Sequence, residues 1–193
     1  MKPFATSAVL WALVPTLIGV GLSTKAQVVQ APGAPIAGLC VYSESLLLGR
    51  SKAGISANQQ LAQIQSSVNA ELSSARDKLV ADNQALEARK SSLSAADYDK
   101  QAADLRARAQ SLEALTRTRN DQLVHTRDAA ISQISTRALP VLNASLTAHH
   151  CAIVVDRASA YSVNPAMDLT GEVLQQVDAA LPSVSLSLAP PQS

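Results

Sequence analysis

Residues 72–93 read LSSARDKLVADNQALEARKSSL, with a leucine at every seventh position. The segment lies within residues 55–170, which contain no glycine and only two prolines, Pro140 and Pro165. Glycine and proline most often interrupt regular structure, and the residues that fill this stretch mostly favour helix. A leucine at every seventh residue is the spacing of a helix that packs against another helix. The stretch therefore predicts a helical rod or hairpin rather than an enzyme pocket.

The leucine repeat belongs to the first of two predicted helices, over about residues 57–92. Asp82 and Arg89 occupy positions of the repeat where apolar residues would sit, so the pattern suits a hairpin seam better than a strong two-stranded zipper. Ser94, followed three residues later by Asp97, has the pattern of a capping box and predicts the start of a second helix. The two helices are therefore expected to form an antiparallel hairpin that turns just before Ser94.

The second helix is predicted over residues 95–139, where small and large apolar residues alternate at steps of three and four. Each arm has roughly 40 residues and a length of about 55–65 Å. Pro140 predicts a kink or a restart of the helix, after which residues 141–148 continue as helix. Because alanines on the seam bury little area, we expect the distal arms to be flexible.

Short apolar segments flank the predicted arm on both sides. Residues 36–42 and residues 152–155 have the composition of β-strands, and residues 161–163 are a further candidate strand. Thr170 is predicted to be the N-cap of a last short helix. The expected fold class is mainly α with a small β body, in which the long antiparallel helical hairpin, a coiled-coil arm, is inserted between short strands.

The predicted organisation is a single domain at residues 36–181. The arm covers residues 51–148, and the β body consists of residues 36–50 and 149–181. Because so few short strands and helices bury too little apolar surface to hold long arms, we expect self-association through the strands. Residues 182–193 are polar and proline-rich, and we expect them to form a disordered tail.

The N-terminal segment has the pattern of a secretory signal. Lys2 precedes an apolar run from Phe4 to Leu22, and Thr24 and Ala26 provide small residues at positions −3 and −1 of a cut after Ala26. An uncleaved membrane anchor is the alternative, since the run is nearly long enough to span a bilayer. A proline in the run and the small residues at its end favour cleavage near Ala26, which leaves a proline-rich linker at residues 27–35.

Cys40 and Cys151 are the only two cysteines. In an exported chain they predict one disulfide, and two buried thiols in apolar strands are the alternative. His149 and His150 beside Cys151 form the only cluster with metal-ligand chemistry, but adjacent side chains diverge and a structural zinc site needs four ligands at fixed spacing. We therefore expect a surface histidine pair, with no metal and no cofactor.

Charge and motifs exclude two classes of function. Removal of residues 1–26 takes away two of the 16 basic residues and none of the 15 acidic ones, so the net charge changes from +1 to −1. Nucleic-acid binding needs a clear basic excess, and we expect no nucleic-acid partner. The sequence contains no paired-carboxylate, glycine-rich phosphate or nucleophile-elbow motif, and we expect no enzymatic activity. The arm is mildly basic, which is also common on an ordinary solvated helix.

Several segments resemble the OmpH/Skp family of periplasmic chaperones. Leu39–Leu47 is similar to the first strand and following turn of the family, and Ala53–Leu61 is similar to the start of its first arm. Ala152–Arg157, Tyr161 and Asp168–Val177 resemble its C-terminal signature. The order of signal peptide, strand, helical arm, strand and closing helix is also that of the family.

The resemblance implies an ATP-independent periplasmic holdase that binds unfolded outer-membrane proteins and prevents their aggregation before membrane insertion. It also implies a homotrimer with a shared β body. The residues expected in that trimer body are Leu39, Val41, Ile153, Val154 and Val155. The well-known family members are strongly basic, and this chain is nearly neutral, which weakens the case for electrostatic capture of clients and for binding to lipopolysaccharide. Contact with a membrane surface stays open as a further partner. The basic arm residues that remain as candidates for client binding are Arg106, Arg108, Arg117, Arg119 and Arg127.

The alternative function is a structural or adaptor coiled coil in the cell envelope with one defined partner. Helical hairpins of this kind occur in efflux adaptors, but those proteins carry flanking barrel domains that this sequence lacks. The holdase is therefore the preferred interpretation of the sequence.

Overall fold

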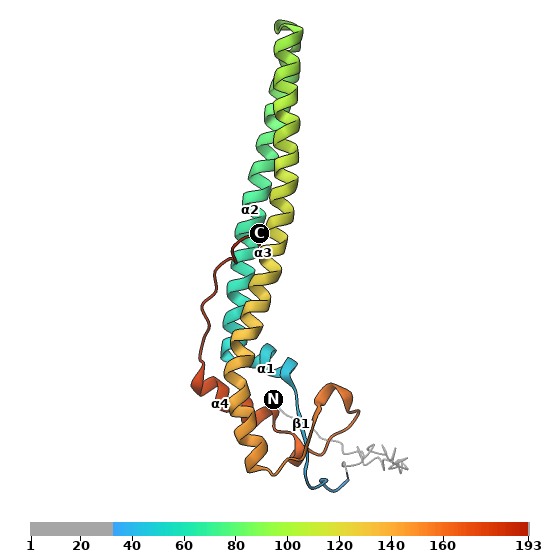
Figure 1. Cartoon of the computed structure of the whole chain (residues 1–193), viewed down its shortest axis with the longest axis vertical. Helices are drawn as coiled ribbons and strands as arrows, with labels where there is room; N and C mark the ends of the chain where they lie inside the picture. Colours follow the sequence, from blue (N-terminus) through green and yellow to red (C-terminus); the bar gives the residue numbers. More distant parts are fainter. Residues whose placement is uncertain (1–32, 193) are drawn as a thin grey trace, which may run out of the picture. The chain divides into compact units, whose positions relative to one another are not determined.

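The computed structural model of the chain describes residues 33–192 (Figure 1). The predicted signal segment, its cleavage site and most of the linker lie outside these residues. Between residues 33 and 192, no helix is both long and apolar enough to cross a membrane.

Two long helices form the predicted hairpin (Figure 1). Helix α2 covers Lys52–Ala88 and helix α3 covers Ala95–Ala148, with a single turn of 3₁₀ helix at Lys90–Ser92 between them. Helix α2 begins five residues earlier than predicted, because the side chain of Ser51 accepts a hydrogen bond from the Gly54 amide at 3.0 Å and caps it. A shorter helix, α1 (Glu44–Arg50), directly precedes it.

Helix α3 begins at the predicted capping box. The Ser94 hydroxyl accepts a hydrogen bond from the Asp97 amide at 3.1 Å and donates one to Asp97 Oδ2 at 2.6 Å. The helix then continues past Pro140 to Ala148, so the predicted restart at this proline is wrong. Proline removes one helical hydrogen bond, here to the carbonyl of Thr136. Both Pro140 and Thr136 lie on the exposed side of the helix, where water can replace that bond.

The two helices meet along a narrow seam. Its buried members are Val68, Leu72 and Leu86 of α2, and Gln122, Thr126, Ala130, Ile134 and Ala138 of α3. Leu79 and Leu93, which continue the leucine repeat, are only partly buried. The seam is therefore closed near the base of the hairpin and at Leu86, and more open around Leu79 and at the tip.

The sheet has two strands, β1 (Leu39–Tyr42) and β2 (Ile153–Asp156), which pair in parallel with Leu39 opposite Ile153. On its other side β1 contacts the chain near Asp168, where the Leu169 amide donates to the Val41 carbonyl at 2.9 Å. In the described part of the chain, β2 has β1 as its only partner. One edge of β2 is therefore unpaired.

The predicted strand at residues 161–163 is wrong. The chain turns instead through a short 3₁₀ helix at Arg157–Ser159, which Asp156 caps by accepting a hydrogen bond from the Ala158 amide at 2.7 Å. This turn leads the chain away from the sheet and leaves Tyr161 fully exposed.

Helix α4 (Thr170–Ala180) closes the base, and Thr170 is not its N-cap. The Thr170 hydroxyl instead accepts a hydrogen bond from the Ser43 amide at 3.0 Å, which ties α4 to the start of α1. Asp168 accepts from the Thr170 amide at 3.0 Å. Val173 and Val177 of α4 and Leu47 of α1 have no exposed surface and form the centre of the core.

The C-terminal segment, residues 182–192, is not the disordered tail that we expected. It follows the α2–α3 hairpin away from α4 (Figure 1). Val184 is buried against the core, and side chains of both long helices hydrogen-bond to the backbone of the segment. Its polar, proline-rich composition predicted disorder. Composition does not reveal that side chains far away in the sequence hold the segment in place.

Candidate functional site

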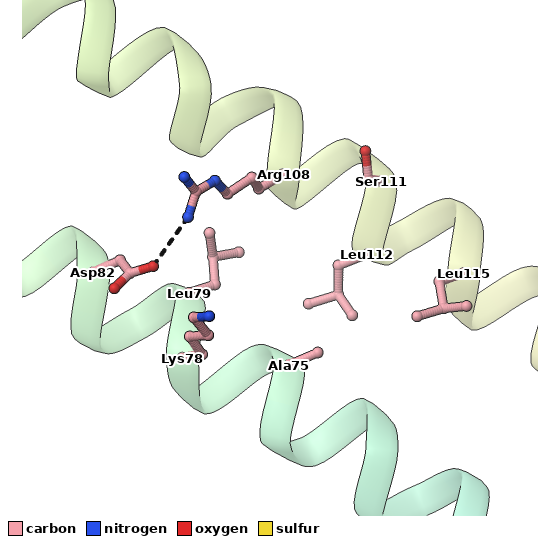
Figure 2. Close-up of a pocket in the computed structure, with 8 residues that line it drawn as sticks. All are labelled: Ala75, Lys78, Leu79, Asp82, Arg108, Ser111, Leu112 and Leu115. Atoms are coloured by element: carbon pink, nitrogen blue, oxygen red, sulfur yellow. Dashed lines mark hydrogen bonds and ion pairs between the residues drawn. The ribbon is translucent and has the colours of Figure 1, made fainter.

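The distal half of the hairpin carries two open grooves, of about 300 and about 440 Å³, the first with mostly apolar walls and the second with mixed apolar and polar walls. In the first groove, Leu79 of α2 and Leu112 and Leu115 of α3 point into the space between the helices (Figure 2). Ala75 lies at its floor and is too small to fill this space. An apolar side chain from another protein can therefore enter here and cover these leucines.

The second groove lies closer to the tip and shares Leu79 with the first. Ala102 and Ala109 of α3 leave room beside the larger residues Tyr98 and Leu105. The Tyr98 hydroxyl donates a hydrogen bond to a Glu87 carboxylate oxygen at 2.5 Å, and this bond raises the pKa of Tyr98. Both grooves form because the seam positions follow helical spacing but carry small residues. Their side chains have too little volume to fill the space between α2 and α3.

Three of the five predicted client-binding arginines are paired with carboxylates. Arg108 lies 3.2 Å from Asp82 across the seam (Figure 2) and 2.6 Å from Asp104 on its own helix. Arg117 lies 2.6 Å from Glu113. These neighbouring carboxylates offset the positive charge of the arginines.

Arg119 makes the strongest pair of the arm. Its guanidinium donates two hydrogen bonds to the Glu71 carboxylate, at 2.8 and 2.9 Å, and these bonds lower the pKa of Glu71. A third donor of Arg119 bonds to Gln122 Oε1 at 2.8 Å. Arg119 therefore links α2 and α3 and is less available to a client than we expected from the sequence.

Arg106 and Arg127 have no carboxylate partner within residues 33–192 and line grooves. Arg106 borders the second distal groove. Arg127 borders a third groove of about 270 Å³ at the base of the arm, together with Ile131 and Leu61. The structure therefore distributes the five arginines along the arm rather than collecting them into one basic site.

The residues predicted for a trimer body lie together on the two strands. The register places Leu39 opposite Ile153 and Val41 opposite Val155. Val41 is 3% exposed, whereas Ile153 and Val154 are 60% and 40% exposed. An apolar strand with an unpaired edge is a surface that pairs readily with another chain.

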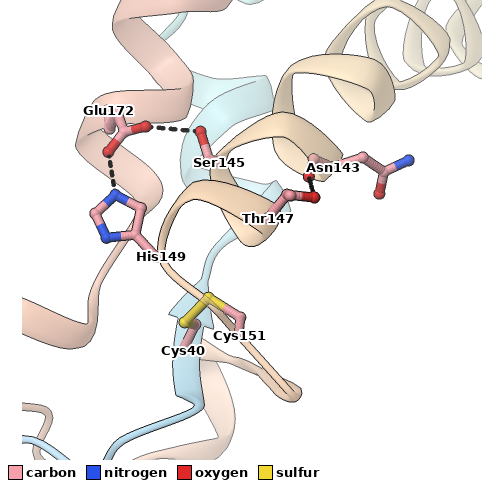
Figure 3. The surroundings of a disulfide bond; sticks show 7 residues. All are labelled: Cys40, Asn143, Ser145, Thr147, His149, Cys151 and Glu172. Carbon is pink, nitrogen blue, oxygen red and sulfur yellow. Dashed lines mark hydrogen bonds and ion pairs between the residues drawn. A yellow bond between two sulfur atoms is a disulfide. The ribbon is translucent and has the colours of Figure 1, made fainter.

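Cys40 of β1 and Cys151, just before β2, form a disulfide in the structure, with their Cα atoms 5.7 Å apart (Figure 3). His149 Nε2 lies 2.7 Å from a carboxylate oxygen of Glu172. His149 and Cys151 of the His-His-Cys cluster therefore have different partners, a carboxylate and a disulfide. Between residues 33 and 192, no three His, Cys, Asp or Glu side chains are placed to hold a metal ion.

Sequence reasoning missed three polar residues that contact the C-terminal segment: Gln60, Gln122 and Thr126. Gln122 and Thr126 are 4% and 1% exposed, although polar residues of a surface helix normally face water. Their spacing of four residues, in register with Ala130, was a signal that they share the buried face of α3.

Comparison with known proteins places this architecture in a family. The family model described as "Outer membrane protein (OmpH-like)" matches residues 39–177. A crystal structure of a protein from Caulobacter crescentus CB15, described as an outer membrane chaperone (OmpH-like), is similar with a TM-score of 0.78 and 27% sequence identity. The match covers 82% of this chain and 94% of that chain. No curated protein matches the chain. Since the family model covers most of the sequence, from β1 to α4, the chain belongs to the OmpH-like outer membrane protein family.

Proposed function

We propose that this protein is an ATP-independent periplasmic holdase, which binds unfolded outer-membrane β-barrel proteins and prevents their aggregation before insertion. The observation that carries the proposal is the pair of open grooves on the distal hairpin, both of which have leucine side chains in their walls. The family, and the description of the Caulobacter protein as an outer membrane chaperone, support it.

The grooves suit a client without a fixed sequence. Each is open to solvent, and Leu79, Leu105, Leu112 and Leu115 in their walls are only partly buried. Burying apolar surface contributes about 25 cal/mol per Å², so one groove gives a weak contact and several together retain a chain. Such contacts need no nucleotide, because each one forms and breaks near equilibrium.

Self-association is part of the proposal. The exposed edge of β2, with Ile153 and Val154 on its surface, is the element through which we expect chains to join. A homotrimer joined there would present three arms to one client and add their weak contacts together. Because three of the five candidate arginines are already paired with carboxylates, we expect electrostatic attraction to clients or to a membrane surface to contribute little.

The first test is light scattering after a urea-unfolded outer-membrane β-barrel protein is diluted into buffer with the purified protein, without ATP. We expect suppression of aggregation at about three chains per client. A soluble unfolded enzyme serves as a control for selectivity. No suppression at large excess would contradict the holdase and favour an envelope adaptor, whose single partner would then be sought by affinity capture.

The grooves themselves are tested by substitutions. The double change Leu79→Ser and Leu112→Ser should weaken suppression several-fold, whereas either single change should have a small effect because the contacts are spread over the arm. Val124→Ser is the matched control, since Val124 lies on the same arm, is 58% exposed and lines neither distal groove. Complete loss of binding from one arm substitution would contradict the diffuse mode of binding.

A further inference from the structure

The C-terminal segment lies along the hairpin as a ligand would. Residues 182–192 have no regular secondary structure, yet Val184 is 8% exposed and belongs to the core cluster. The family model ends at residue 177, so the segment lies beyond the part of the chain that it matches. Its contacts with α2 and α3 show what kind of polypeptide this surface accepts.

Gln60 of α2 recognises the backbone of the segment with both atoms of its amide. Its Nε2 donates to the Val184 carbonyl at 2.6 Å, and its Oε1 accepts from the Leu186 amide at 2.9 Å. A carbonyl and an amide two residues apart are the groups that an extended strand offers to a neighbouring strand. The amide of Gln60 thus makes the same pair of hydrogen bonds that a neighbouring strand would make.

Thr126 and Gln122 of α3 bind the segment again at Ala189. The Thr126 hydroxyl donates to the Gln122 carbonyl at 2.6 Å and accepts from the Ala189 amide at 2.9 Å. Gln122 Nε2 donates to the Ala189 carbonyl. These two contacts, like the two of Gln60, use backbone groups of the segment and do not depend on its side chains.

Arg119 fixes the direction of the Gln122 amide. Guanidinium groups only donate hydrogen bonds, so the Gln122 oxygen must face Arg119, 2.8 Å away. The amide nitrogen is then left to face the segment, where it needs a carbonyl. Glu71 holds the same guanidinium from α2. Arg119 is therefore a positioning residue for the backbone site.

The side chains of the segment alternate. Val184, Leu186 and Leu188 are buried or half-buried, whereas Ser185 and Ser187 are exposed. Burial at every second residue is the pattern of an extended chain with one face against a surface. The same alternation of apolar and polar residues is the sequence signature of a strand of a transmembrane β-barrel.

We propose that residues 184–189 occupy a binding site for extended polypeptide on one face of α2 and α3, and that a strand of an unfolded outer-membrane β-barrel protein displaces them. Backbone hydrogen bonds provide the affinity, and the spaces for alternate side chains select the two-residue period. The C-terminal segment is then a built-in competitor that covers the site when no client is present. The identity of the partner rests on the proposed function, whereas the site for an extended segment does not.

The test uses the full-length chain with its own segment released. The double variant Val184→Asp and Leu186→Asp places charges where the segment packs against the helices. The probe is a fluorescein-labelled synthetic peptide with the sequence of residues 182–192, PSVSLSLAPPQ, and binding is measured by fluorescence anisotropy. We expect the released variant to bind it at least about tenfold more tightly than wild type, in which the tethered segment competes at high effective concentration.

Two matched controls, one in the peptide and one in the protein, distinguish binding at this site from nonspecific binding. The peptide PVLLSSSAPPQ has the same composition without the alternation and should bind the released variant at least about tenfold more weakly. Gln60→Ala in the released variant should weaken binding of the original peptide several-fold. Gln65→Ala should leave it unchanged, because Gln65 is an exposed glutamine of the same helix whose side chain, among the described residues, hydrogen-bonds to Asn69 and not to the segment. Equal binding of the two peptides, or no binding of either, would contradict the proposal that this surface is a site for extended polypeptide.

The partner is tested by competition. Addition of a urea-unfolded β-barrel protein should release the bound peptide, and the released variant should suppress its aggregation at a lower ratio than wild type. If the peptide bound as expected but the barrel protein did not displace it, the segment would be a brace and the proposal would be wrong. If no variant suppressed aggregation, the proposed holdase function would fail, and peptide anisotropy would still decide whether the site accepts extended chains.

Discussion

At the scale of single residues, a few side chains fasten α4 to the base of α3. Ser145, which is 2% exposed, donates to one carboxylate oxygen of Glu172 at 2.8 Å, and His149 lies 2.7 Å from the other (Figure 3). These hydrogen bonds, with that of Ser145 first, lower the pKa of Glu172 below its ordinary value of 4.5. The folded state therefore favours the ionised carboxylate.

This pKa shift predicts a dependence of stability on pH. A carboxylate with a lowered pKa in the folded state stabilises fully above its ordinary pKa, and the contribution is lost as pH falls through the folded value. We expect Glu172→Gln to be less stable than wild type near neutral pH, with a difference that shrinks below a pH of about 4.5. Thermal unfolding followed by circular dichroism over this range measures it, and a difference that stays constant would contradict the assignment.

Two glycines near the junction of α1 and α2 give a matched pair of substitutions. A Cβ on Gly54 would overlap the Leu48 carbonyl oxygen and lie 2.8 Å from its carbon, whereas a Cβ on Gly49 meets nothing within 4 Å. Gly54→Ala should therefore destabilise by more than about 2 kcal/mol through overpacking. Gly49→Ala should stabilise by about 0.5–1 kcal/mol, because it lies inside α1. Urea unfolding measures both, and equal effects would show that the junction is not tightly packed.

At the scale of elements, the disulfide closes a loop that contains the whole arm. Cys40 and Cys151 are 111 residues apart in sequence and hold the ends of β1 and α3 together. The chain-entropy model gives about 4–5 kcal/mol for a loop of this length as an upper figure. We expect Cys40→Ser with Cys151→Ser to lower stability by about that amount or less, as measured by urea unfolding at a fixed protein concentration. Reduction of wild type with dithiothreitol is the control and should give the same loss.

The long helices were predictable because their signals are local. The leucine repeat, the absence of glycine and the capping box at Ser94 each act within a few residues, and the structure confirms the hairpin. The C-terminal segment was not predictable, because Gln60 and Gln122 lie 124 and 67 residues away from the groups they bind. The error at Tyr161 has a related origin: three residues of β-composition do not form a strand unless a sheet edge is within reach.

The candidate site was only partly predictable for the same reason. The arginines could be named from composition, and the pair of Arg117 with Glu113 follows from their spacing of four on one helix. The pairing of Arg119 with Glu71 and of Arg108 with Asp82 depends instead on how the two helices face each other. The distal grooves likewise depend on the positions of small residues in the folded seam. Sequence patterns identify which face of a helix is apolar, and packing decides how much of that face remains open.

At the scale of the whole molecule, the exposed edge of β2 predicts assembly. Ile153→Lys places a charge on this strand, which is a common means of preventing edge pairing. We expect the variant to sediment as a monomer under conditions in which wild type sediments as an oligomer. Ile36→Lys is the matched control, because Ile36 is equally exposed, at 62% against 60%, but lies outside both strands. Oligomers of unchanged size in the Ile153 variant would place the interface elsewhere.

The seven-residue spacing on α2 has a consequence for the dimensions of the arm. Within residues 33–192, the distal parts of α2 and α3 pack mainly against each other. Inserting seven residues into α2 and seven into the facing part of α3 would therefore keep every leucine on the seam and leave the base unchanged. Each such pair of insertions would lengthen the hairpin by about 10 Å. The reach of the molecule is therefore adjustable in fixed steps, independently of the part that folds and assembles it.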